Sequence, residues 1–211
     1  MITSNKTLVY VLATIILVGV SFFVYIHFFK SDDIKNYPSL GQDVIAFGDS
    51  LVFGQGASDG GKNFVSLLSK RTGESIVNLG VSGNTTGQAL SRLSDLDAYN
   101  PKVVLVLLGG NDYLQKVPIE TTFQNLANII KNIQRRGAVV VLLGVRGGLL
   151  NDRFDTEFEK LSKQYKTAYV SDVLDGLIAD SRYMADAVHP NDIGYQKIAD
   201  RIYPILQKFI K

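Results

Sequence analysis

The sequence contains no cysteine. This absence excludes disulfide bonds, a thiol nucleophile and thiolate metal sites, and it leaves the redox compartment open. An excess of one charge is also missing from most of the chain. Lys6 and Lys30 are the only Lys, Arg, Asp or Glu residues among the first thirty, so 22 less two leaves 20 basic residues against 20 acidic ones. The part after residue 30 therefore has no net formal charge and no basic footprint for nucleic acid.

Most of the first thirty residues belong to one long, uncharged apolar stretch. Leu8 to Phe29, LVYVLATIILVGVSFFVYIHFF, is 22 residues long. As a helix it would extend roughly 33 Å, which is enough to cross the hydrocarbon core of a bilayer. A signal peptide has a shorter apolar region and a small-residue cleavage site, which the closing IHFFK lacks. We therefore predict an uncleaved, single-pass membrane anchor over 1–30; a buried helix of the folded domain is the alternative.

The flanks of this stretch suggest its orientation. Lys6 precedes it, and the basic residues after it are offset by Asp32 and Asp33. This small bias favours an inner N-terminus and a body on the outer, periplasmic side of the cell membrane. His27 lies near the outer end, where we expect an interfacial side chain and not a ligand. The polar segment 31–42, SDDIKNYPSLGQ, contains Pro and Gly and is predicted to be a linker.

From Asp43 onwards, short apolar runs alternate with segments of helical periodicity. Two runs, KVVLVLLGG and AVVVLLG, are continuous Val/Leu segments typical of parallel strands that are covered on both faces. The expected strands are 43–47, 75–79, 102–108, 138–144 and 168–171. The expected helices are 63–71, 86–96, 119–136, 152–165, 173–179 and 192–210. This alternation predicts one α/β domain over 43–211, a three-layer α/β/α sandwich around a five-stranded parallel sheet.

Polar or glycine-rich loops follow the first four predicted strands, and a fifth precedes the last helix. They contain GDS with Ser50, GVSGNTT with Gly83, GGND with Asn111, VRGGLLND, and DAVHPND with His189. Because ligands bind at the carboxyl ends of parallel strands, these loops are expected to converge on one site. Each motif alone is usually a turn or a helix cap, so only their joint occurrence carries weight. GDSLVFGQG lacks the spacing of a dinucleotide or Walker phosphate loop, which argues against nucleotide binding.

The residue types in these loops suit nucleophilic catalysis. A Ser hydroxyl needs an adjacent base, and His189 is the only histidine of the body. Asp186, three residues earlier, could orient the imidazole; Asp192 is the rival, although it is better placed to cap the last helix. The backbone N–H groups of Ser50 and Gly83 and the side chain of Asn111 could donate to a developing oxyanion.

Together these motifs resemble the SGNH hydrolases, also called the GDSL family. The matching residues are Ser50 in FGDSL, Gly83 in NLGVSGNTT, Asn111 in LGGND and His189 in DAVHP. The resemblance covers about 43–211 and is strongest to the bacterial branch of arylesterase, thioesterase I and lysophospholipase L1. It implies a flavodoxin-like SGNH hydrolase fold, a Ser50–His189–Asp186 triad, an oxyanion hole from Ser50, Gly83 and Asn111, and no metal or cofactor.

Three features depart from that branch. Asn84 stands where an Asp usually follows the second-block Gly, and Leu149 and Leu150 lie where an Asn-Tyr-Gly usually flanks the acyl pocket. The permanent anchor replaces a cleaved leader. We therefore expect a membrane-tethered serine esterase for carboxylic esters or thioesters, including lysophospholipids. An envelope carbohydrate O-acetylesterase and a non-catalytic, membrane-tethered binding module are the alternatives.

Overall fold

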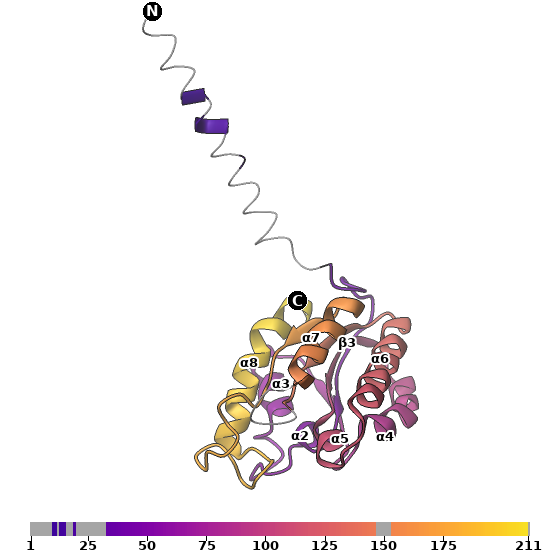
Figure 1. The fold of residues 1–211 in the computed structure, drawn as a ribbon, viewed down its shortest axis with the longest axis vertical. Helices are drawn as coiled ribbons and strands as arrows, with labels where there is room; N and C mark the ends of the chain where they lie inside the picture. The colour runs from indigo at the N-terminus through magenta and orange to yellow at the C-terminus, as the bar shows by residue number, and fades with distance from the viewer. Residues whose placement is uncertain (1–9, 12, 16–18, 20–32, 147–152, 211) are drawn as a thin grey trace, which may run out of the picture. The chain divides into compact units, whose positions relative to one another are not determined.

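The computed structural model describes residues 10–11, 13–15, 19, 33–146 and 153–210 (Figure 1). The chain divides into two compact units, Met1–Asp33 and Ile34–Lys211. Most of the predicted anchor over 1–30, with His27, lies outside the described residues, as do Leu149 and Leu150. Across the ranges that are described, none of the helices combines the length and apolarity that a membrane crossing requires.

A five-stranded parallel sheet forms the centre of the second unit, as predicted. Its strands are β1 (Asp43–Gly48), β2 (Ile76–Gly80), β3 (Pro101–Leu107), β4 (Val139–Leu143) and β5 (Ala168–Val170), in the order β2-β1-β3-β4-β5. Each predicted strand agrees with an observed one to within one residue at either end. β3 and β4 are buried along nearly their whole length, because helices cover both faces of the sheet.

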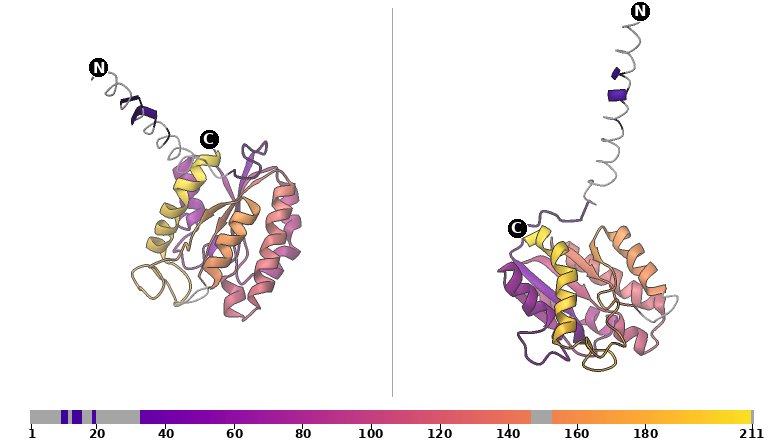
Figure 2. Two further views of the ribbon diagram at one scale, coloured as in Figure 1. Left: turned by 45° about the horizontal axis from the view of Figure 1, so that its top comes forward. Right: turned by 90° about the vertical axis from the view of Figure 1, so that its left-hand side faces the viewer.

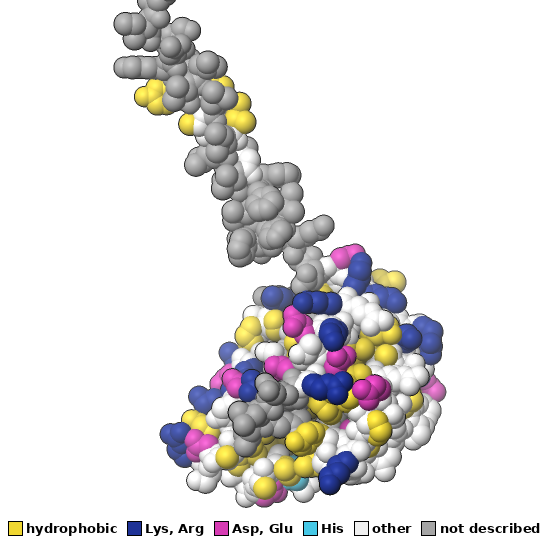
Figure 3. Space-filling model, viewed as in Figure 1, with side chains coloured by type: hydrophobic (Ala, Val, Ile, Leu, Met, Phe, Trp, Pro, Cys, Tyr) yellow, Lys and Arg dark blue, Asp and Glu magenta, His cyan; other side chains and the backbone are white. Residues whose placement is uncertain are grey.

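Helices lie on both sides of this sheet (Figures 1 and 2). α3 packs beside α8, whereas α6 packs against both α4 and α7. The helices are α2 (Ser50–Phe53), α3 (Phe64–Thr72), α4 (Thr86–Ser91), α5 (Gly110–Leu114), α6 (Ile119–Arg135), α7 (Arg153–Tyr165) and α8 (Asp192–Ile210), with a 3-10 helix η1 (Leu93–Ala98). The three-layer architecture is therefore confirmed. Basic and acidic side chains are intermingled on the face seen in Figure 3, in keeping with the balanced charge of the sequence.

Two helix predictions were wrong. The predicted helix 173–179 is a series of turns, because Gly176 adopts φ +66° and the Arg201 guanidinium binds the carbonyl oxygens of Val173 and Asp175. Those two carbonyls therefore accept side-chain hydrogen bonds in place of the backbone hydrogen bonds of a helix. The predicted helix 86–96 breaks at Arg92, where α4 ends and η1 begins. The short helices α2 and α5, one turn or little more each, were not predicted.

The segment predicted as a linker is held on the domain from Ile34 onwards. The Lys35 N–H donates to the Lys166 carbonyl, and the Asn36 amide donates to the carbonyls of Gln134 and Ala138. The Tyr37 ring packs edge-on against Phe209, with ring centroids 5.2 Å apart. These contacts lie at the amino ends of β4 and β5, the edge of the sheet opposite to the predicted site.

Candidate active site

Ser50 lies on the first turn of α2, just beyond the carboxyl end of β1, the strand between β2 and β3. The Asp49 carboxylate caps this helix, since its Oδ1 accepts the Leu51 N–H at 3.0 Å. α2 lies so close to β2 that a Cβ on Gly80 would come within 2.1 Å of the Phe53 nitrogen. Glycine is therefore required there, and the tight packing fixes the position of the serine.

A continuous chain of hydrogen bonds connects Ser50 with a histidine and a carboxylate. The His189 Nε2 lies 3.1 Å from the Ser50 Oγ, and the Nδ1 lies 2.7 Å from the Asp186 Oδ2. The other carboxylate oxygen of Asp186 accepts the backbone N–H groups of Val188 and His189. The Val188 N–H and the imidazole lower the pKa of Asp186 to about 2, so this carboxylate is ionised at neutral pH.

The rival carboxylate, Asp192, points elsewhere. It accepts hydrogen bonds from the backbone and hydroxyl of Ser58 and pairs with Lys62 at 3.0 Å. The prediction that it caps α8 was also wrong, because the Asn191 Oδ1 accepts the N–H groups of Ile193 and Gly194. The side chain that caps α8 is therefore Asn191, one position before the predicted Asp192.

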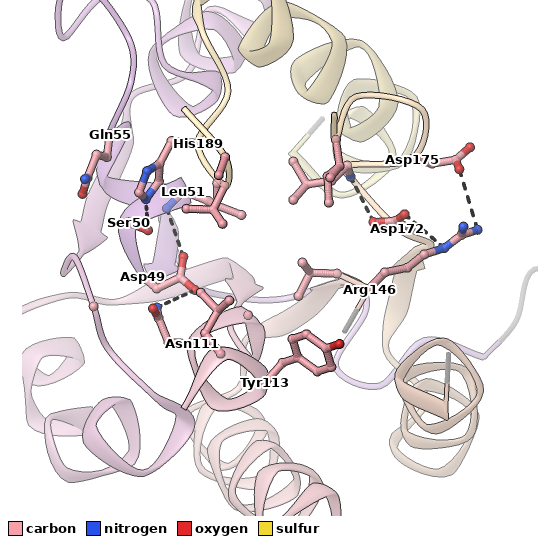
Figure 4. A pocket seen from close by; sticks show the side chains of 18 of the residues that line it. Asp49, Ser50, Leu51, Gln55, Asn111, Tyr113, Arg146, Asp172, Asp175 and His189 are labelled. Carbon is pink, nitrogen blue, oxygen red and sulfur yellow. Dashed lines mark hydrogen bonds and ion pairs between the residues drawn. The ribbon is translucent and has the colours of Figure 1, made fainter. Parts of the chain in front are cut away.

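Gly83 and Asn111 line the same cavity as Ser50 and His189. Figure 4 shows Asn111 on the same side of this cavity as Ser50 and His189. Gly83 adopts φ +81°, and the space where its Cβ would stand is open. Asn111 lies on α5, and Gly109, the residue before this helix, adopts φ +115°, which favours glycine. Its amide nitrogen is 3.1 Å from the Asn84 carbonyl oxygen and 3.4 Å from the Asp49 Oδ2. The structure thus brings all five predicted site residues together.

Arg92 holds the loop and strand ends next to this site, a role that was not predicted. Its Nε donates to the Asn84 Oδ1 at 2.7 Å, and its Nη2 donates to the carbonyls of Gly48 and Leu79. The guanidinium lies over the Phe47 ring, 4.3 Å from its centroid. It therefore ties the ends of β1 and β2 to the loop that positions the Asn111 amide. No local motif marks this role, because the partners are distant in sequence.

Asp49 is a second unpredicted member of the site, although it belongs to the GDS motif. The residue is only 3% exposed. Burial raises its pKa to about 7, against the opposing effects of the Leu51 N–H and His189. A carboxyl with a raised pKa binds its proton more tightly in the folded protein than in the unfolded chain. Its contribution to stability is therefore lost as the pH rises from about 4 towards 7.

We expect Asp49→Asn to remove this pH dependence. Asn keeps an acceptor for the Leu51 N–H and is neutral in both states. The free energy of unfolding of the variant, relative to the parent, should rise by about 3–4 kcal/mol between pH 4 and pH 8. Urea unfolding at several pH values measures this difference, with the exposed Asp97→Asn as control. A difference that is the same at every pH would contradict the assignment.

Residues 46–197 match the GDSL-like Lipase/Acylhydrolase family. The chain is 30% identical over 181 residues to the esterase TesA of Pseudomonas aeruginosa, covering 80% of this chain and 90% of that protein. It is 31% identical over 143 residues to the thioesterase 1/protease 1/lysophospholipase L1 of Escherichia coli K12, covering 64% and 69%. A crystal structure of TesA superposes with a TM-score of 0.73 at 28% identity, covering 80% of this chain and 99% of that one.

Proposed function

Because this chain belongs to the GDSL-like lipase/acylhydrolase family and is a serine ester hydrolase, we propose that Ser50, His189 and Asp186 form its catalytic triad. The observation that carries this proposal is the unbroken path from the Ser50 Oγ through the imidazole to the Asp186 carboxylate. Asp186 fixes the tautomer that leaves Nε2 free to accept the hydroxyl proton, and it stabilises the imidazolium that then forms.

The reaction follows from this geometry. The Ser50 Oγ attacks the acyl carbonyl as His189 Nε2 takes its proton, and the imidazolium then protonates the departing alcohol or thiol. Water attacks the acyl-enzyme with His189 again as the base, and the carboxylic acid leaves. Because the pKa of Asp186 is held at about 2, it stays ionised through both steps.

We assign the oxyanion hole to the N–H groups of Ser50 and Gly83 and to the Asn111 side chain. All three residues line the cavity beside the hydroxyl. One Nδ2 hydrogen of Asn111 is donated to the Asn84 carbonyl, which holds the amide at the cavity. The other makes only a long contact with the Asp49 Oδ2, at 3.4 Å, and we assign it to the developing negative charge.

The substrate is a small-molecule ester or thioester. The cavity beside Ser50 has a volume of about 600 Å³, within the range of ligand sites. Apolar side chains contribute much of its lining, among them Leu51, Val145, Leu174 and Ile178. Such a lining suits the hydrocarbon part of an acyl ester, and lysophospholipids are among the substrates we propose.

We also propose that residues 1–30 anchor the enzyme in the cell membrane, with the domain on the outer side. The uncharged stretch from Leu8 to Phe29 supports this. The full chain should remain with the membrane fraction after a salt wash, whereas a chain beginning at Ser31 should not. Release of both by salt would contradict the anchor.

The catalytic assignment is tested by hydrolysis and by covalent labelling. The full chain should hydrolyse aryl esters and acyl thioesters. A p-nitrophenyl alkylphosphonate should inactivate it, because one hydroxyl forms a bond to phosphorus as p-nitrophenol is released. Peptide mass spectrometry should place that modification on Ser50. Modification of another serine, with loss of activity, would overturn the assignment of the nucleophile.

We expect Arg92→Met to impair both catalysis and stability. The carbonyls of Gly48 and Leu79 lose a charged donor, which should lower the free energy of unfolding by about 2 kcal/mol or more. Asn84 loses its restraint, so Asn111 shifts and kcat should fall about tenfold with little change in KM. Asn84→Asp keeps the acceptor for Arg92 and is the matched control. Equal losses of kcat in both variants, or an unchanged kcat in Arg92→Met, would contradict this role.

A further inference from the structure

The cavity beside Ser50 meets a cluster of charges on its opposite side. Figure 4 shows Ser50 and His189 on one side and Arg146, Asp172 and Asp175 on the other. The Arg146 Nε lies 3.2 Å from the Asp172 Oδ2, and the Nη2 lies 3.7 Å from the Asp175 Oδ1. We call these three residues the ion-pair cluster.

The cluster is anchored by the fold and is not a loose surface pair. Arg146 follows β4 and Asp172 follows β5, so neighbouring strands position the two charges. The Asp172 side chain is only 6% exposed, and its Oδ1 accepts the Leu174 N–H. Burial raises the pKa of Asp172 above its ordinary value, and the Arg146 guanidinium opposes that shift.

A second cavity of about 410 Å³ shares Arg146, Asp172 and Asp175 with the first. The side chains that line only this second cavity include Asp155, Tyr169 and Arg201, so its character is more polar. The ion-pair cluster therefore lies at the boundary between an apolar cavity that contains the nucleophile and a polar one that does not.

We propose that the ion-pair cluster sets the upper limit of acyl-chain length, so that the preferred substrates, lysophospholipids included, are esters of short to medium acyl chains. This inference rests on the proposed function, because it takes Ser50 as the point from which the chain is measured. An acyl chain gains free energy while its methylenes contact Leu51, Val145 and Leu174. One that reaches the cluster displaces water from charges and offers them no hydrogen bond in return.

The expected signature is a break in the chain-length profile. Each methylene placed in an apolar groove raises kcat/KM about fourfold. For the full chain, kcat/KM on p-nitrophenyl esters from acetate to palmitate should therefore rise with length and then fall once the cluster is reached. In the double variant Arg146→Met/Asp172→Asn, the fall should come at a longer chain. The ratio of long-chain to short-chain kcat/KM should increase about tenfold or more.

The choice of substitution at Asp172 and two control variants make this result specific. In the double variant, Asp172→Asn keeps the acceptor for the Leu174 N–H, so the turn is preserved. Arg146→Lys retains the charge and should give the parent profile. Arg71→Met removes an arginine of similar exposure, 44% against 41%, which pairs with Asp200 and does not line the cavity. It should also leave the profile unchanged.

The outcomes separate this proposal from the function on which it rests. If the parent hydrolyses no ester, the proposed function fails. If the parent is active and the double variant keeps acetate hydrolysis with the break unmoved, only the role of the cluster fails. Loss of acetate hydrolysis in both the double variant and Arg146→Met alone would also overturn it, because a cluster that limits length leaves short esters untouched.

Discussion

Replacing Ser50 by alanine is expected to lower kcat for aryl esters by roughly 10⁴–10⁶-fold, as in hydrolases that use the same constellation. Without the Oγ there is no acyl-enzyme, and the remaining groups only bind the ester and polarise its carbonyl. His189→Ala should cost nearly as much, because the hydroxyl then has no base within reach. The double variant should be little worse than either single variant, since the two residues act as a unit.

Stopped assays over hours, at substrate concentrations above KM, are needed to measure such low rates. Ser91→Ala is a matched control, because this exposed hydroxyl on α4 donates to the Gln88 carbonyl and does not line the cavity. It should retain the activity of the parent. A Ser50→Ala variant within tenfold of the parent would eliminate Ser50 as the nucleophile.

The second large effect is expected at the oxyanion hole. Asn111→Ala removes one of the three assigned donors and should lower kcat about 10²–10³-fold, or about 2.7–4 kcal/mol in the activation barrier. KM should change little, because the donor acts on charge that develops after binding. The phosphonate should also modify Ser50 more slowly in this variant. Attack of the Ser50 Oγ on phosphorus develops negative charge on an oxygen that the same donors would stabilise.

Asn132→Ala is the control for this substitution. Asn132 lies on α6 and accepts a hydrogen bond from Arg136, away from the cavity. Its removal should leave kcat unchanged. If Asn111→Ala instead raises KM and leaves kcat intact, Asn111 binds the ground state and the third donor must be sought elsewhere.

The sheet could be predicted because its signal is local. The β3 and β4 segments are continuous apolar runs, and such runs are typical of parallel strands that are covered on both faces. This pattern is contained within each segment. The turns over 173–179 could not be predicted, because the groups that bind their carbonyls belong to Arg201 on a later helix. The spacing of apolar residues in one segment does not reveal a hydrogen bond from a guanidinium group that is distant in the sequence.

The site shows the same contrast. That Ser50, His189 and Asp186 lie together could be predicted, because a nucleophile, a base and an orienting acid must be of particular residue types and the body offers one histidine. Arg92 could not, since an arginine within a helical segment is ordinarily a solvated one. The raised pKa of Asp49 was also invisible, because it depends on burial that only the folded structure defines.

The docking of residues 34–42 at the amino-end edge has a practical consequence. β3, with seven residues, separates that edge from the catalytic one by about 23 Å. Lys35 and Asn36 fasten the chain there, so anything joined ahead of Ile34 is attached a full strand length from Ser50. The amino terminus of the domain is thus an attachment point that lies away from the cavity. Coupled to a bead through its amino terminus, the domain should hydrolyse small esters with the kcat/KM of the free enzyme, whereas coupling through residues at the cavity mouth should obstruct it.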